Sequence, residues 1–314
     1  MLYACLYVYP TQKFHGYIAL VLSIIGLAIN VTSIIIFKQP HMMQSPTNRM
    51  FMVLAVVHAM GHVILIPYHV YDYILNIPCK SKMGKQFILT CYILAYWVYN
   101  TAAWLIVAMA GIRYKTISIS KLGRQTNVAK TVCIVVVWAI VITVPPGMLY
   151  EVKVTSENET CYDIELTDLA ASRKSILSRA LFAIAGVVTR CMPYVVMAIY
   201  TALLSKIIIS SVHRRSTMNC SNNYTISRTH MKTTTMLVVI IMIEILVEFP
   251  NGVFLIINAF DDEFYDDVLK YLRQVLALFT LMKWNLNIFV YYVMSTTFRD
   301  TFKHYILRCC PKVK

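Results

Sequence analysis

Charged side chains are scarce in this sequence. They make up 14% of its 314 residues, whereas hydrophobic residues make up 58%. A soluble globular domain needs more polar surface than this composition provides, so the scarcity of charge excludes that class. The formal net charge of +14 does not indicate nucleic-acid binding, because Lys and Arg lie in short segments between long apolar runs. The composition predicts an integral membrane protein.

The sequence also lacks the features that divide a chain into domains or mark an enzyme. No linker, internal repeat or low-complexity stretch separates a second unit. No nucleophile elbow or phosphate-binding loop is present, and the pair His58 and His62, one helical turn apart, has no third convergent metal ligand. We therefore expect one bundle with no enzymatic activity, no cofactor, no bound metal and no nucleic-acid partner.

Seven apolar stretches are long enough to cross a bilayer about 30 Å thick. The first has no charged residue and lacks the short apolar core of a secretory signal, so we interpret it as a retained helix. The predicted fold is an all-α membrane protein, a seven-transmembrane helix bundle at 16–294. An extracellular N-terminus at 1–15 precedes it, and a short C-terminal amphipathic helix with a cytoplasmic tail follows at 295–314. The seven spans are residues 16–37, 49–75, 86–113, 130–150, 180–208, 233–260 and 268–294.

Charge asymmetry between the loops predicts the orientation. Lys and Arg are retained on the cytoplasmic side of a membrane protein. If the N-terminus is extracellular, the segments outside the spans that face the cytoplasm are rich in Lys and Arg and contain a single acid, Asp300. The glycosylation sequon at Asn158 then falls outside, where the transferase acts. Cys309 and Cys310 follow an amphipathic stretch and are candidate palmitoylation sites. We expect a multi-pass plasma-membrane protein in contact with membrane lipids, with its C-terminus in the cytoplasm.

Short motifs on the first three spans resemble those of rhodopsin-like G-protein-coupled receptors. Asn30 lies in a run, Gly-Leu-Ala-Ile-Asn-Val, that is similar to the signature of their first helix. Residues 54–58 read Leu-Ala-Val-Val-His and resemble Leu-Ala-x-x-Asp, with His58 where the acid is expected. Residues 112–114 read Ile-Arg-Tyr and resemble Asp-Arg-Tyr, with Ile112 in place of the acid.

The last two spans extend the resemblance. Residues 248–252 read Glu-Phe-Pro-Asn-Gly and are similar to the Glu-Leu-Pro-Gln-Gly pattern of insect myosuppressin and FMRFamide-type receptors and of nematode class W (Srw) serpentine receptors. Residues 287–291 read Asn-Ile-Phe-Val-Tyr and resemble the Asn-Pro-x-x-Tyr region. The resemblance covers residues from about 20 to 305, and it depends on these motifs occurring in the expected order.

The resemblance implies a receptor that couples to a heterotrimeric G protein. In the family, the arginine that closes the third span holds the inactive state through its neighbouring acid and engages the G protein on activation. Ile112 cannot form that ion pair, so we predict high basal activity that an Ile112→Asp change lowers. The residues that the resemblance assigns to coupling and activation are Arg113, Tyr114, Pro250, Asn287 and Tyr291.

Polar and ionisable side chains within the predicted spans need pairing, because an isolated charge at mid-bilayer costs about 3 kcal/mol or more. Glu244 and Glu248 lie one helical turn apart on the same face. We expect Lys283 to lie near His58 and Glu248, and to pair with Glu248 either as a switch or as a structural clasp. With His58 and Lys283 there, the sodium ion that the resemblance implies should be absent. The predicted intramembrane polar cluster is Asn30, His58, Glu244, Glu248 and Lys283.

Two acidic segments indicate a cationic ligand. Residues 151–168 and 261–267 make the predicted extracellular mouth electronegative, although such runs are often only solvated loops. The resemblance implies a short amidated peptide ending in Arg-Phe, whose arginine Glu248 or Asp72 would accept. Arg190 would either reach Glu244 or Glu248 or contact an acidic ligand. The ligand-binding candidates are Glu248, Asp72, Arg190, Asp262 and Trp97.

Other functions stay open. A chemosensory receptor for a small molecule fits the same family, and the departures from its motifs allow a receptor that signals weakly. A transporter or channel would use the intramembrane ionisable residues as an ion path. The resemblance also implies a disulfide from Cys161 to the top of the third span, where the expected position is Ile88. Cys79 or Cys91 must substitute, and we favour Cys79 because it lies in the oxidising compartment.

Overall fold

The computed structural model describes the chain in several stretches. They are residues 2–75, 77, 79–118, 127–154, 161–168, 180, 183, 186–217, 224–260 and 270–309. Within these residues, seven helices are long and apolar enough to cross a membrane. The predicted seven-helix class is therefore confirmed.

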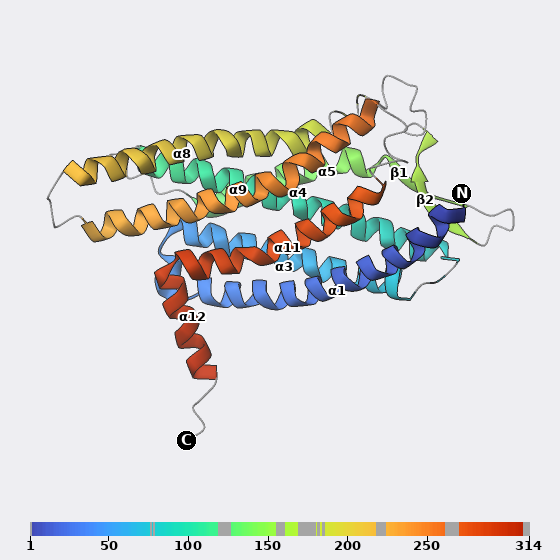
Figure 1. Cartoon of the computed structure of the whole chain (residues 1–314), viewed down its shortest axis with the longest axis horizontal. Coiled ribbons are helices and arrows are strands. Elements are labelled where there is room, and N and C mark those ends of the chain that lie inside the picture. Colours follow the sequence, from blue (N-terminus) through green and yellow to red (C-terminus); the bar gives the residue numbers. More distant parts are fainter. Residues whose placement is uncertain are drawn as a thin grey trace.

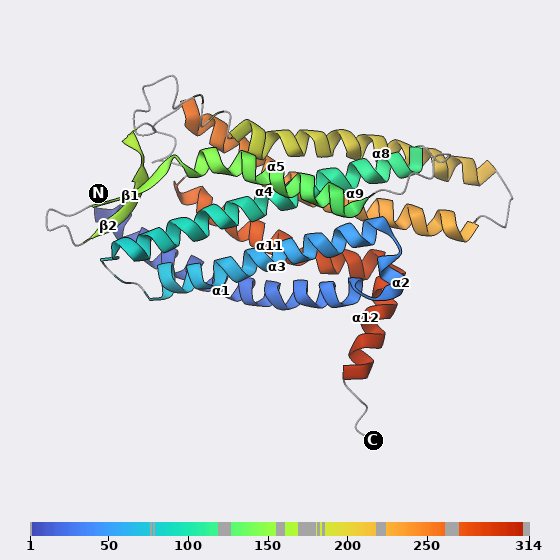
Figure 2. The ribbon, with the colours of Figure 1, turned by 180° about the vertical axis from the view of Figure 1, so that it is seen from behind.

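The long helices run side by side in one bundle (Figures 1 and 2). An apolar segment in lipid must satisfy its own backbone hydrogen bonds, and a helix does so within itself. Two of the helices include π-helical turns that were not predicted: η1 (Val70–Ile74) ends the second span and η2 (Val187–Cys191) begins the fifth. The long helices are α1 (Leu2–Phe37), α3 (Pro46–His69), α4 (Lys82–Ser118), α5 (Val128–Gly147), α8 (Met192–Thr217), α9 (Tyr224–Phe260) and α11 (Lys270–Met294).

Two short helices lie near the end of the bundle that carries the C-terminus. Helix α2 (Pro40–Met43) follows α1, and helix α12 (Thr296–Cys309) leaves the bundle at a steep angle (Figure 1). Phe298 anchors α12, because its side chain is fully buried and its ring centroid lies 5.1 Å from that of Phe37 and 5.6 Å from that of Tyr291. The predicted short C-terminal helix is therefore present, and we call this end of the bundle the α12 end.

A β-hairpin stands at the opposite end, beside the N-terminus (Figures 1 and 2). Strand β1 (Tyr150–Val154) pairs with strand β2 (Tyr162–Leu166) in antiparallel register. The all-α prediction missed this hairpin, although Tyr-Glu-Val-Lys-Val and Tyr-Asp-Ile-Glu-Leu both alternate apolar and charged residues as strands do. We call this end of the bundle the hairpin end.

The hairpin is tied to the loop that precedes α4. A disulfide joins Cys79 to Cys161, so the pairing favoured from sequence is confirmed, and Cys91 remains a buried free thiol. The Tyr162 amide donates to the Lys80 carbonyl at 3.2 Å. Lys85 Nζ lies 2.6 Å from Asp163 Oδ1. These contacts hold the hairpin across the hairpin end of α4.

Candidate functional site

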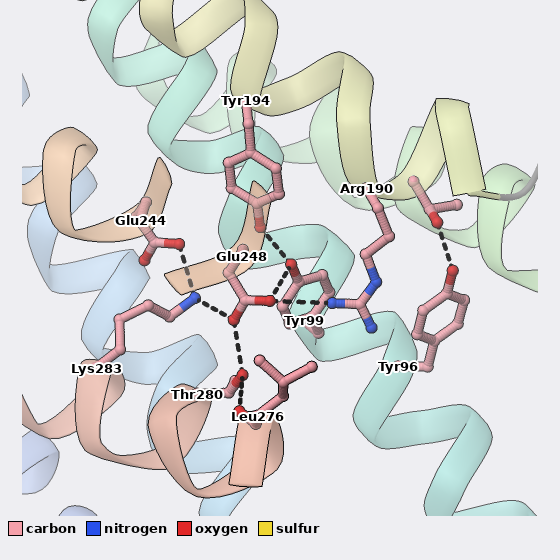
Figure 3. Close-up of polar contacts among 10 residues, drawn as sticks. Tyr96, Tyr99, Arg190, Tyr194, Glu244, Glu248, Leu276, Thr280 and Lys283 are labelled. Carbon is pink, nitrogen blue, oxygen red and sulfur yellow. Dashed lines mark hydrogen bonds and ion pairs between the residues drawn. The ribbon is translucent and has the colours of Figure 1, made fainter. Parts of the chain in front are cut away.

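Glu248 lies at the centre of a buried polar cluster between α4, α9, α11 and η2 (Figure 3). Its side chain is 0% exposed. Oε1 accepts hydrogen bonds from Thr280 Oγ1 at 2.8 Å and from Lys283 Nζ at 2.9 Å. Oε2 accepts from the Tyr99 hydroxyl at 2.8 Å and from Arg190 Nη1 at 3.3 Å. Since a carboxylate offers about four lone-pair sites, these donors fill its acceptor capacity.

Lys283 joins the two carboxylates that share one face of α9. Its Nζ lies 2.7 Å from Glu244 Oε2 as well as 2.9 Å from Glu248 Oε1. The predicted contact between Glu248 and Lys283 is therefore present, whereas its role as a switch stays a prediction. With Arg190 the cluster holds two cations and two carboxylates. Its charges balance, as burial in a low-dielectric interior requires.

Arg190 enters the cluster from η2, on the other side of Glu248 from Lys283 (Figure 3). Its guanidinium carbon lies 3.7 Å from the centroid of the Tyr99 ring and 5.2 Å from that of Tyr96. Both distances are within the range of cation–π attraction. The Arg190 side chain is 13% exposed, so it keeps more accessible surface than Glu248 at 0% or Lys283 at 2%.

Gly252 lets α9 approach η2 closely enough for this contact. A Cβ at this position would lie 2.9 Å from Cys191 Sγ and 3.0 Å from Arg190 Cβ. Contacts that short require a neighbour to move, so only glycine fits without displacement. The Glu-Phe-Pro-Asn-Gly run thus supplies both the central carboxylate and the close approach that brings Arg190 to it.

The two remaining members of the predicted polar cluster, His58 and Asn30, form their hydrogen bonds with other residues. His58 is fully buried and stacks on Trp284 at a centroid distance of 5.3 Å. Its Nδ1 lies 3.5 Å from Asn287 Nδ2. Asn30 donates to the Gly26 carbonyl of its own helix at 2.8 Å. Of the five residues predicted to cluster, Glu244 and Glu248 are each ion-paired to Lys283, and Lys283 lies near enough to His58 for an electrostatic interaction.

A second interhelical contact lies toward the α12 end. Arg113 Nε, in α4, donates to Thr234 Oγ1, in α9, at 2.8 Å. Both side chains are buried, at 3% and 0% exposed. The sequence reasoning missed Thr234, because a threonine in an apolar helix carries no signal of its partner. The contact supplies a restraint on Arg113 that Ile112 cannot provide.

Tyr114 and Tyr291 lie near this end, whereas Pro250 lies beside the Glu248 cluster. Tyr114 lies beside Tyr200, with ring centroids 6.2 Å apart. Tyr291 is buried and stands 5.1 Å from both Phe37 and Phe51. Pro250 lies inside α9, two residues after Glu248. Their roles in coupling stay predictions.

Of the remaining ligand-binding candidates, the structure describes Asp72 and Trp97. Asp72, in η1, forms an ion pair with Lys80. Trp97 is packed against the core, and its indole Nε1 is buried without a hydrogen-bond acceptor among the described residues. The structure leaves four sequence predictions untested: Asp262, Asn158 and Cys310 lie outside the described residues, and for Cys309 only the helical backbone is described.

Charges on the hairpin also pair among themselves. Lys153 Nζ lies 2.5 Å from Asp168 Oδ1 and 2.9 Å from Glu151 Oε1. The hydrogen bond from Lys153 lowers the pKa of the Asp168 carboxyl and raises the pKa of the Lys153 ammonium group. These exposed pairs are screened by solvent, and they partly neutralise the acids that sequence assigned to the electronegative mouth.

Comparison with known proteins shows a family and a curated protein to which this chain is similar. A family model described as serpentine type 7TM GPCR chemoreceptor Srw matches residues 17–309. The G-protein coupled receptor dmsr-1 of Caenorhabditis elegans is 21% identical over 345 aligned residues, which cover 92% of this chain and 67% of that protein. The family match includes every element that contributes to the Glu248 cluster.

Proposed function

This chain belongs to the serpentine Srw family of seven-transmembrane G-protein-coupled chemoreceptors, and we propose that its ligand is a short, cationic, amidated peptide of the Arg-Phe type. As a member of that family it is a multi-pass plasma-membrane receptor for an extracellular ligand. The acidic segments at 151–168 and 261–267 support a cationic ligand, because a negative mouth raises the rate at which cations arrive.

We further propose that the hairpin end faces outside and the α12 end faces the cytoplasm. The Cys79–Cys161 disulfide supports this orientation, since structural disulfides persist in oxidising compartments. The excess of Lys and Arg in the segments at the other end supports it as well. Tags at Met1 and Lys314 should then be accessible from opposite faces of an intact cell. Accessibility from the same face would contradict this orientation.

One observation carries the proposed mechanism: Glu248 joins α9 to α4, to α11 and to η2 through a single carboxylate. Helix α9 is also joined to α4 near the α12 end through Thr234 and Arg113. We propose that these two contacts hold the resting state. Ligand binding at the hairpin end would then rearrange the hydrogen bonds of Glu248 and thereby weaken the contact between Arg113 and Thr234. A ligand shifts the equilibrium between the resting and the signalling state only if its contacts differ between these two states.

A signalling screen tests the proposal. Cells expressing the full chain are exposed to amidated Arg-Phe peptides, with Glu248→Gln as the test variant and Asp300→Asn as a control that removes the same charge from exposed helix α12. We expect a response in the wild-type receptor and in the control, and a weakened response in Glu248→Gln. Silence of a surface-displayed wild-type receptor to every peptide would refute the peptide ligand. Small molecules would then be screened, because the family description is that of a chemoreceptor.

A double-mutant cycle tests whether the cluster acts as a switch. Glu248→Gln, Lys283→Met and the double variant are compared for basal and ligand-driven signalling. We expect the effects to be strongly non-additive, because the two side chains share one contact at 2.9 Å. Additive effects would reduce the pair to a structural clasp. Ion currents or uptake in cells that lack G proteins would instead favour a transporter or channel.

A further inference from the structure

The geometry points to Arg190 as the residue that receives the ligand, and to a hydrogen-bond acceptor, a carbonyl, carboxamide or carboxylate oxygen, as the ligand group that binds it. This inference rests on the proposed receptor function and deepens it, since it specifies which chemical group reaches the buried cluster. It also reverses the polarity expected from sequence, in which Glu248 accepts a ligand cation.

Glu248 has no free acceptor site for a cationic ligand group. Thr280 and Lys283 bind Oε1, and Tyr99 and Arg190 bind Oε2. A ligand guanidinium would have to displace one of these donors and leave that donor buried. Displacing Lys283 or Arg190 would leave an uncompensated buried cation, which is strongly unfavourable.

Arg190, in contrast, has donors to spare. A guanidinium carries five N–H donors in a planar fork. Among the described residues, Nη1 binds Glu248, and Nε is buried without an acceptor. Buried donors without acceptors are unfavourable until a partner arrives. Because Arg190 is also the most accessible charged member of the cluster, at 13% exposed, it is the group that a ligand can reach first.

The charge balance favours the same ligand group. The two cations and two carboxylates already cancel. A ligand cation would add an uncompensated charge to a low-dielectric site, whereas a neutral carbonyl or carboxamide adds none. A carboxylate would add one negative charge directly against a guanidinium, a geometry that allows bidentate binding.

The surroundings of Arg190 favour an aromatic group next to the acceptor. Tyr96 and Tyr99 hold their rings within 5.2 Å and 3.7 Å of the guanidinium carbon. Aromatic rings pack favourably against one another in offset or edge-on arrangements. The C-terminal phenylalaninamide of an Arg-Phe peptide combines a carboxamide oxygen with a phenyl ring, so we infer that this end of the peptide reaches Arg190 while its arginine stays nearer the acidic mouth.

Thermal unfolding of the purified full chain tests this inference with small probes. N-acetyl-phenylalaninamide supplies a neutral acceptor, N-acetylphenylalanine a carboxylate, and 2-phenylethylguanidine a cation on a similar ring. We expect saturating acceptor probes to raise the unfolding midpoint by about 2–4 °C and the cation to leave it unchanged. Comparison of the two acceptors shows whether a carboxamide or a carboxylate is preferred.

Variants of Arg190 assign the shift to its guanidinium. Arg190→Met should abolish the shift. If that variant fails to fold, Arg190→Lys keeps the charge and loses the planar fork, and should weaken probe binding about tenfold. Lys206→Met removes an exposed cation from the adjoining helix α8 and serves as the matched control, in which the shift should persist.

Three results would overturn the inference: no shift from either acceptor in the wild-type protein, an equal shift from the cation, or acceptor binding that is as strong in the Arg190 variants as in the wild-type protein. The proposed function is judged separately, by signalling in cells. Probe binding that depends on Arg190, in a receptor that no Arg-Phe peptide activates, would refute the peptide ligand and leave the acceptor site standing. Peptide signalling without Arg190-dependent probe binding would support the peptide ligand and refute the acceptor site at Arg190.

Discussion

Replacing Lys283 with methionine should destabilise the bundle mainly through Glu244. Among the described residues, Lys283 is the only hydrogen-bonding partner of the Glu244 carboxylate, which is 2% exposed. Glu248 loses the same ammonium group but keeps Tyr99, Arg190 and Thr280. The substitution therefore leaves one buried carboxylate without a donor and the other well satisfied.

The size of the effect follows from this asymmetry. Removing one partner of a buried ion pair costs about 3–5 kcal/mol, because the other charge stays buried and unpaired. For a protein of this size that corresponds to a fall of roughly 6–15 °C in the unfolding midpoint. Differential scanning fluorimetry of the detergent-purified full chain measures it, with Lys303→Met, an exposed substitution in α12, as the control.

Two double variants separate specific pairing from net charge. Lys283→Met with Glu244→Gln leaves Arg190 paired to Glu248 and should recover most of the lost stability. Lys283→Met with Glu248→Gln has the same net charge, but it leaves Glu244 and Arg190 without their partners and should recover little. Equal recovery in both double variants would refute the reasoning, since only the charge count would then matter.

Three further substitutions test other contacts. Thr234→Val removes one acceptor of Arg113, a charged hydrogen bond worth about 1.5–3 kcal/mol, and should raise basal G-protein signalling per surface receptor. An unchanged baseline would contradict a resting-state role. Gly252→Ala should lower the unfolding midpoint by several degrees, since overpacking costs about 1–3 kcal/mol. Gly147→Ala should leave the midpoint unchanged, because a Cβ at that position makes ordinary contacts of 3.5 Å. Similar effects at both sites would contradict the close approach of α9 to η2. Cys79→Ser should lower the midpoint and the surface display, because losing a disulfide typically costs about 2–4 kcal/mol; unchanged values would show that the hairpin is held without it.

Much of the fold was predictable because the signals are local. An apolar run of sufficient length forms a helix in lipid whatever its neighbours are. The choice of Cys79 as the partner of Cys161, which the structure bears out, followed from the oxidising compartment that the predicted orientation assigns to Cys79. The hairpin has a local signal as well, because its strands alternate apolar and charged residues, but an alternation of only five residues is a weak signal beside helices of 20 residues or more.

The candidate site was predictable only in part. Sequence identified Glu244, Glu248 and Lys283 because charged residues inside apolar spans must find partners. It left two alternatives for Arg190, a contact with Glu244 or Glu248 or a contact with an acidic ligand. It did not predict that the hydrogen-bond partner of His58 is Asn287. Each of these outcomes depends on which faces of two helices meet, and spacing along the chain does not specify that.

The sequence by itself determined that this protein has seven spans and that several charges must be buried among them, because hydrophobic length and the energy of burying a charge depend on the residues alone. The tertiary structure decided which charge meets which. The π-helical turn η2 and the side-chain-free surface of Gly252 bring Arg190 to Glu248, and packing brings Thr234 to Arg113 across 121 residues of chain. Helix rotation and approach distance set these contacts, and both are properties of the assembled bundle.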